Sequence, residues 1–188
     1  MRITTIELTP DLWPAVEALF GKNGACGGCW CQWWRIEKGE RWDDVKGAAA
    51  KRRLKKGILS SAVQAVLAFD GETPVGWCTF GPRDSFPRLN RARTLACADS
   101  ASVWSLPCFF VAKSHRGKGV AKAMLAHALR AMKKRGAPIA EGYPSRPGAD
   151  GSYIAAFAYT GTESLFEKAG FTAVGEPAAS RLRVRKRL

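Results

Sequence analysis

The segment Arg116-Gly117-Lys118-Gly119-Val120-Ala121 constrains the fold of this chain more than any other stretch. An apolar run over residues 108–112 precedes it, and apolar residues follow it at helical spacing. The order predicts a strand, a glycine-rich turn and a helix. Glycines let the backbone approach a ligand closely. The helix N-terminus turns free N–H groups and a positive dipole end toward the turn, which suits a phosphate or pyrophosphate.

The spacing of the glycines in this turn excludes two other known phosphate-binding motifs. The Gly-x4-Gly-Lys-Ser/Thr pattern of a nucleotide-binding P-loop is absent, and the three-glycine spacing of the dinucleotide fingerprint does not occur. A turn that only joins a strand to a helix is the remaining alternative. Arg116 and Lys118 add positive charge to the turn, and Lys113, Ser114 and His115 precede it.

The turn resembles the Arg/Gln-x-x-Gly-x-Gly/Ala signature of the GNAT N-acetyltransferase superfamily, with Arg116, Gly119 and Ala121 at the defined places. About fifty residues later, Ser164 to Phe171 resembles the Leu-Tyr-x-Lys-x-Gly-Phe segment of that family. The resemblance covers residues 103–175 well and the rest in outline. It implies one domain over residues 1–188, with a GNAT-like α/β fold in which helices flank a mixed, mostly antiparallel sheet.

The resemblance also implies a function, which is transfer of an acetyl group from acetyl-coenzyme A to a primary amine of a small molecule or protein. Direct attack in a ternary complex is the expected mechanism. Phe109 and Val111 would pair with the pantetheine arm like an added strand, and the turn would hold the pyrophosphate. The expected cofactor-binding residues are Phe109, Val111, Arg116, Gly117, Lys118, Gly119, Val120, Ala121 and Phe166.

The chain departs from the family at the expected catalytic positions. Many relatives place a tyrosine, the general acid, where Phe166 stands, and phenylalanine cannot donate a proton. Tyr159, seven residues earlier, is the predicted substitute, with packing as the alternative. Ser105 stands where some relatives keep a base carboxylate, so Glu141 is predicted as the base, with a salt-bridged glutamate or a water chain as alternatives. Cys108 is expected to be a small apolar filler rather than a nucleophile.

A cysteine- and tryptophan-rich segment, residues 26–35, is the second unusual feature. Cys26, Cys29 and Cys31 have a spacing that could bind zinc, but a fourth ligand and a second pair are missing from the sequence nearby, and a redox dithiol lacks a thioredoxin-like context. We expect this segment to cover the acceptor cleft. The residues predicted to bind the acceptor are Trp30, Trp33 and Trp34, and core packing of two of these indoles is the alternative.

The net charge of +14 over 188 residues favours anionic partners. Basic residues gather in residues 51–56, residues 133–135 and the tail from Arg181 to Arg187. Coenzyme A is one such anion. A nucleic-acid-associated protein, or a zinc-stabilised binding module without catalysis, is the alternative function. No nucleic-acid module is recognisable in the sequence, and solvated basic faces would explain the charge equally well.

The sequence also bears on location. No apolar run approaches the roughly 20 residues of a membrane span, and the first residues lack the apolar stretch of a signal peptide. A cytoplasmic protein with reduced cysteines is therefore expected. A homodimer is compatible with the resemblance, and the acceptor is not readable from the chain.

The remaining elements follow from periodicity and turn residues. We expect a helix after Thr9 and Pro10, with Thr9 as its cap, and a loop over residues 81–102. A further helix is expected over 42–59, the central helix should end at Gly136, and a short helix should span 163–169. The expected strands are 2–8, 62–69, 75–80, 137–143, 171–175 and 181–187.

Overall fold

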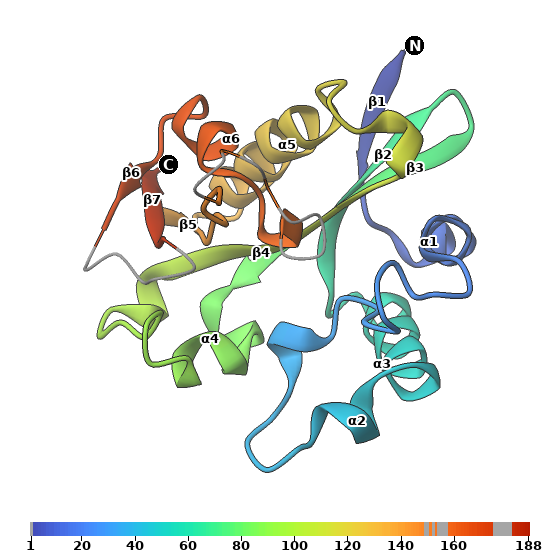
Figure 1. The fold of residues 1–188 in the computed structure, drawn as a ribbon, viewed down its shortest axis with the longest axis horizontal. Helices are drawn as coiled ribbons and strands as arrows, with labels where there is room; N and C mark the ends of the chain where they lie inside the picture. Colours follow the sequence, from blue (N-terminus) through green and yellow to red (C-terminus); the bar gives the residue numbers. More distant parts are fainter. Residues whose placement is uncertain (1, 149–150, 152, 154–157, 175–181) are drawn as a thin grey trace.

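The computed structural model describes residues 2–148, 151, 153, 158–174 and 182–188. Its described strands form one seven-stranded sheet in the order β1-β2-β3-β4-β5-β7-β6 (Figure 1). All neighbours pair antiparallel except β4 and β5, which run parallel. The strands are β1 (Ile3–Glu7), β2 (Gln64–Asp70), β3 (Thr73–Pro82), β4 (Val103–Val111), β5 (Ile139–Gly142), β6 (Thr172–Ala173) and β7 (Val184–Arg187). The described α-helices are α1 (Trp13–Phe20), α2 (Trp42–Val45), α3 (Ala48–Leu59), α4 (Pro87–Arg91), α5 (Val120–Lys134) and α6 (Glu163–Glu167).

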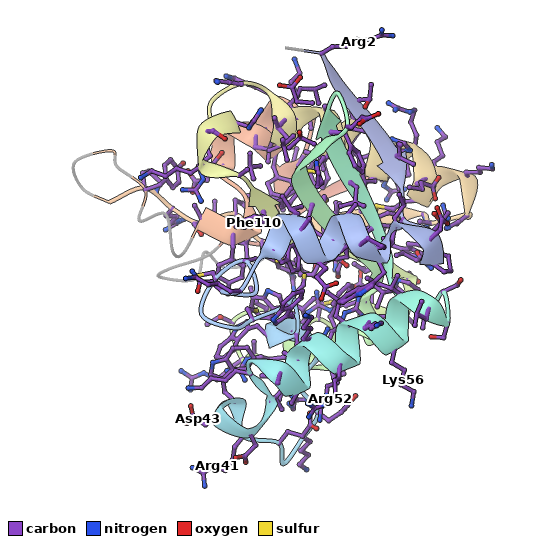
Figure 2. The ribbon with its side chains drawn as sticks, turned by 90° about the vertical axis from the view of Figure 1, so that its right-hand side faces the viewer. Arg2, Arg41, Asp43, Arg52, Lys56 and Phe110 are labelled. Atoms are coloured by element: carbon purple, nitrogen blue, oxygen red, sulfur yellow. The ribbon has the colours of Figure 1, made fainter. Side chains whose placement is uncertain are left out.

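Helices cover both faces of the sheet. Side chains alternate between the faces along a strand, and on β2 this places Val66 toward the cluster around α5 and Leu67 toward the cluster around α1 and α3. Figure 2 shows α1 and α3 side by side on their face, with Lys56 of α3 extending outward. The sheet is thus the middle layer of three.

The long helix α5 forms where the sequence predicts it. Gly119 precedes it with φ of +80°, and Gly136 follows it with φ of +76°. This left-handed conformation favours glycine at both ends. Gly76 on β3 lets α5 approach the sheet closely, because a Cβ there would lie 2.8 Å from Val120 Cγ1. The first turn of α5 is therefore fixed against the centre of the sheet.

A bulge divides β4 into two parts. Thr79 faces Cys108 and Gly81 faces Ser105, so Leu106 and Pro107 together lie opposite a single β3 residue. The parallel pairing with β5 ends at the same level, at Leu106 and Gly142. Beyond it, β4 continues to Val111 next to β3 only, among the described strands. Bulges redirect strands and are frequent near active sites.

The structure corrects several expected boundaries. The helix expected over 42–59 is broken before Gly47, which has φ of +72°, into α2 and α3. The loop expected over 81–102 contains α4, and two short 3-10 turns flank that helix. Thr9 makes no side-chain cap, and its helix begins as a 3-10 turn over Pro10–Leu12. The short helix and the strand expected at 137–143 are shorter than predicted. The strands expected at 171–175 and 181–187 are found as β6 (Thr172–Ala173) and β7 (Val184–Arg187), and residues 175 and 181 lie outside the described residues.

Within the described residues, no helix is both long enough and apolar enough to cross a membrane.

Candidate active site

The turn before α5 presents backbone donors. The first bond within the helix runs from the Ala123 amide to Gly119 O (3.0 Å), so the amides of Val120, Ala121 and Lys122 have no acceptor inside the helix. Gly117, like Gly119, has a positive φ, of +72°. A Cβ at either glycine would meet no atom within 4 Å. Both glycines therefore have free space where a side chain would project.

The second half of β4 offers a strand edge. The Ala112 amide donates to Val75 O on β3 (2.9 Å). Because backbone groups alternate along a strand, the amides of Phe109 and Val111 point to the other edge, where β5 has already ended. Arg116 Nε donates to Val111 O (3.1 Å) and ties the turn to this edge. An extended ligand could pair here as a strand does.

A cavity of about 620 Å³, here called the turn cavity, connects these two features. Cationic side chains contribute to its wall, namely Arg116, Lys122 and Lys168, and none of its described lining residues is acidic. Of the residues predicted to bind the cofactor, the wall contains Phe109, Val111, Arg116, Gly117, Gly119, Val120 and Ala121. Lys118 is exposed beside the wall without being part of it. The cationic wall suits a polyanionic ligand.

Phe166 occupies a different place from the other predicted cofactor residues. Its ring is fully buried and packs edge-on against Phe109 and Phe171. It also lies against Gly142 and Gly161, at which a Cβ would overlap the ring. Leu165, its neighbour in α6, lines the turn cavity instead. Phe166 therefore packs against both strands, at Phe109 on β4 and at Gly142 on β5, where the two strands separate.

A second cavity of about 560 Å³, here called the loop cavity, lies beneath the cysteine- and tryptophan-rich segment. Trp33 and Trp34 line it, whereas Trp30 packs in the core against Trp13 and Phe20. The two cavities share the lining residues Ala25, Cys26, Phe109, Phe110 and Tyr159. The structure thus brings the predicted cofactor and acceptor regions together at β4 and leaves Trp30 out.

Tyr159 lies at the junction of the two cavities. It belongs to a 3-10 turn over Ala158–Thr160 and lines both cavities. Its ring packs against the cluster formed by Trp34, Phe86, Leu89, Leu95 and Tyr143. The position is compatible with a proton donor to a group held against β4.

Glu141 lies in a buried polar network. Its side chain is fully buried and accepts hydrogen bonds from Arg83, from the Tyr143 hydroxyl (2.8 Å) and from Arg185 Nε (2.6 Å). Arg183 Nε lies 3.5 Å from the same carboxylate. Burial, reinforced by the Glu141 charge, raises the pKa of the Tyr143 hydroxyl well above its usual value. Glu141 lines neither cavity, and its contacts favour the salt-bridged alternative over a base.

The cysteines around the loop cavity differ in the direction in which their pKa values are shifted. The Cys31 thiol is buried and accepts from Trp77 Nε1 (3.3 Å). Burial opposes ionisation, but hydrogen bonds from Cys108 and Trp77 and the Arg35 charge lower the pKa of Cys31 overall. Burial, with the neighbouring Cys31, raises the pKa of Cys29 to about 11. Among the described residues, no three His, Cys, Asp or Glu side chains are arranged to hold a metal ion.

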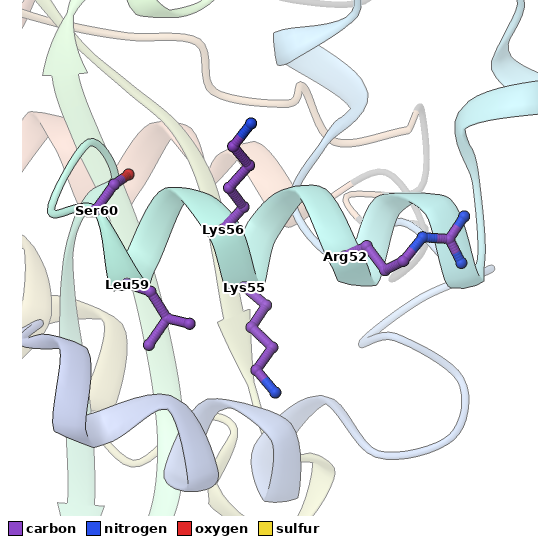
Figure 3. Close-up of a pocket in the computed structure, with 5 residues that line it drawn as sticks. All are labelled: Arg52, Lys55, Lys56, Leu59 and Ser60. Carbon is purple, nitrogen blue, oxygen red and sulfur yellow. The ribbon is translucent and has the colours of Figure 1, made fainter.

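The basic runs lie on separate surfaces. Figure 3 shows Lys55 and Leu59 extending from α3 toward α1, while Lys56 extends to the opposite side. The Lys55 ammonium lies 5.7 Å from the Trp13 ring and that of Lys51 lies 5.2 Å from the Trp30 ring. In the tail, Arg183 and Arg185 do not simply face solvent as charged surface residues. Both contact Glu141, and Arg185 also binds Asp99 (2.6 Å). Arg181 lies outside the described residues.

Residues 29–153 match the acetyltransferase (GNAT) family. Similar solved structures include PaiA N-acetyltransferase from Thermoplasma acidophilum in complex with coenzyme A, with 18% identity, full coverage of both chains and a TM-score of 0.58. YncA from Salmonella typhimurium with acetyl-CoA shares 12% identity over 99% of this chain and 94% of that one, with a TM-score of 0.60. Among curated proteins, no sequence matches this chain. The chain belongs to the GNAT acetyltransferase family and is an acyltransferase.

A third similar structure is the ribosomal-protein-alanine N-acetyltransferase from Brucella melitensis. It shares 15% identity over 98% of this chain and 99% of that one, with a TM-score of 0.60. At these identities the three likenesses establish the fold, and they confirm the expected GNAT-like α/β architecture.

Sequence reasoning missed two arginines of the site region. Arg83 follows β3 in a segment expected to be a loop, and it reaches Glu141 on β5. Arg88 on α4 lies with its guanidinium carbon 3.7 Å from the centre of the Trp33 ring. Nothing in the local sequence signals either contact, because each joins segments about fifty residues or more apart.

Proposed function

We propose that this protein transfers an acetyl group from acetyl-coenzyme A to a primary amine of a small molecule. One observation carries the proposal. A strand edge on β4, a turn with open amides before α5 and a wall of cations surround one cavity, and that cavity meets a second one at Tyr159. The first cavity suits the pantetheine and diphosphate of the donor, and the second suits the acceptor. Family membership and the coenzyme-bound relatives support this donor.

The proposed residues keep their predicted roles where the geometry supports them. Phe109 and Val111 pair with the pantetheine arm, and the amides of the turn hold the diphosphate, with Arg116 and Lys118 adding charge. Trp33 and Trp34 contact the acceptor. The two ligands would meet beside Phe109 and Phe110, which line both cavities. This arrangement favours direct attack within a ternary complex, because the two cavities adjoin and share part of their walls.

The reaction requires one proton to leave the amine and one to reach the departing thiolate. The amine loses its proton to water in the loop cavity, since Glu141 is enclosed by Arg83 and Arg185. The amine attacks the thioester carbonyl, the C–N bond forms and the C–S bond breaks. Tyr159 donates a proton to the departing thiolate and is reprotonated from the nitrogen through water. Proton transfer by a positioned side chain contributes roughly 100-fold or more to a rate.

The test has two stages. Calorimetry should detect binding of acetyl-coenzyme A at one site per chain, and a thiol-release assay against a panel of amines should then identify turnover. Binding without thiol release for any amine would contradict the enzymatic role. Tyr159→Phe should lower kcat about 100-fold with little change in donor binding. Unchanged turnover in that variant would remove Tyr159 from the mechanism.

A further inference from the structure

The described wall of the loop cavity is aromatic and contains one fixed charge. Its aromatic members are Phe20, Trp33, Trp34, Trp42, Phe110 and Tyr159, with Phe109 at the border. Arg88 is the single charged side chain among the described lining residues, and no aspartate or glutamate is among them. An apolar wall with one placed cation selects for an apolar molecule that carries one anionic group.

Arg88 is held in position without a carboxylate partner among the described residues. Its guanidinium stacks on Trp33, with 3.7 Å between the guanidinium carbon and the ring centre. The side chain is half-buried, and this burial together with the neighbouring Arg91 lowers the pKa of Arg88. A partly desolvated guanidinium beside another cation gains from an added anion, and guanidinium binds carboxylate through paired hydrogen bonds.

Arg88 also shares its cavity with the proposed proton donor. Arg88 and Tyr159 both line the loop cavity. Tyr159 lines both cavities, so it lies near the point at which the thioester would meet the amine. An acceptor whose carboxylate contacts Arg88 can therefore present its amine to the thioester from within the same cavity. An amino acid carries both of these groups in one small molecule.

We propose that the acceptor is an α-amino acid with an aromatic side chain, bound through its carboxylate to Arg88 and through its ring to Trp33, Trp34 and Trp42. The proposal rests on the acetyltransferase function above and names its substrate class. The α-ammonium gives one proton to water and attacks the thioester, the C–S bond breaks, and the second proton passes from nitrogen to the thiolate. The products are an N-acetyl amino acid and coenzyme A. Polyamines are disfavoured because the described wall offers them no carboxylate.

The experiment compares acceptors that differ only in the carboxylate. Initial rates at saturating acetyl-coenzyme A are measured for L-tryptophan against tryptamine, for L-phenylalanine against phenethylamine, and for spermidine. The wild-type enzyme should prefer each amino acid over its decarboxylated partner by about 10-fold or more, which is the size expected for a charged hydrogen-bonded pair. Spermidine should be the poorest of the five.

Arg88→Gln should lower kcat/KM for L-tryptophan about 10- to 100-fold and change that for tryptamine less than about threefold. Arg93→Gln removes a charge from an exposed residue nearby and should leave both values unchanged. Unaltered calorimetric binding of acetyl-coenzyme A in Arg88→Gln confirms that this variant is folded. Loss of turnover would then be assigned to acceptor binding.

Two kinds of contrary result are distinguishable. The first kind overturns the substrate class and leaves the acetyltransferase function standing. In it the protein binds acetyl-coenzyme A, but it prefers tryptamine or spermidine, or it does not turn over the amino acids, or Arg88→Gln lowers kcat/KM equally for both members of a pair. Absence of acetyl-coenzyme A binding would overturn the function itself, and the substrate class with it.

Discussion

The ring of Phe166 fills the space that a side chain at Gly142 would occupy. Both residues are buried where β5 ends and β4 continues next to β3. The ring of Phe166 also packs on Phe109, whose amide faces the free edge. The separation of β4 and β5, which leaves the β4 edge free at Phe109 and Val111, therefore depends on Gly142 and Phe166. These two residues are adjacent in space but distant in the sequence.

Gly142→Ala should destabilise the protein by about 1–3 kcal/mol, because the added methyl group overlaps a buried ring. Urea unfolding followed by circular dichroism measures the change. Adding Phe166→Leu to this variant should recover part of the loss, so the two substitutions should be non-additive. Full stability of the single alanine variant would show that the close approach is absent in solution.

Gly119→Ala should cost about 1–2 kcal/mol of stability, because an alanine is strained at a φ of +80°. It should also weaken acetyl-coenzyme A binding at least about 10-fold, because any shift of this residue moves the amides proposed to hold the diphosphate. The matched control is Gly136→Ala at the other end of α5, where φ is +76° and no atom lies within 4 Å of a Cβ. That control should lose similar stability and bind the donor normally. Equal donor affinity in both variants would contradict the assignment of the turn.

Glu141→Gln should lower the free energy of unfolding by about 3–5 kcal/mol, because it breaks a buried ion pair and leaves Arg83 without its anion. Measured at a temperature where the variant is folded, kcat should fall by less than about threefold. A stable variant with a kcat reduced by 100-fold would restore Glu141 as the catalytic base.

Cys26 should be the first thiol modified by N-ethylmaleimide at pH 8. It is exposed and lines both cavities, whereas Cys29 has a pKa of about 11 and stays protonated. Acetyl-coenzyme A should slow modification of Cys26, and peptide mass spectrometry resolves the individual sites. Modification of Cys29 before Cys26, or a rate indifferent to the donor, would contradict the shared junction of the cavities.

The parts of the fold with local signals were predictable from the sequence. The turn and α5 follow from glycines and helical periodicity over residues 116–134, and the β2–β3 hairpin follows from two apolar runs around a Gly71-centred turn. The helix α4 was not predicted, because five residues that include Pro87 carry no helical repeat. The break before Gly47 was missed because a single glycine inside a helical pattern is often tolerated, and the sequence does not reveal its positive φ.

The site was predictable on the donor side and less so on the acceptor side. The glycine turn has its own local signature, so its residues gather as expected around one cavity. Trp30 and Trp34 are both buried, but Trp34 lines the loop cavity and Trp30 packs in the core, a difference that the sequence does not reveal. The partners of Glu141 come from β7 and from the turn after β3, and long-range pairs of this kind leave no local pattern.

The most direct test is the position of the donor's diphosphate in a crystal structure of the protein with coenzyme A. We expect the diphosphate oxygens to lie within about 3 Å of the backbone amides between Gly117 and Lys122, a normal hydrogen-bond distance, with the pantetheine arm alongside Phe109 and Val111. A diphosphate bound elsewhere, or a turn left unoccupied while coenzyme A is present, would contradict the assignment of this site.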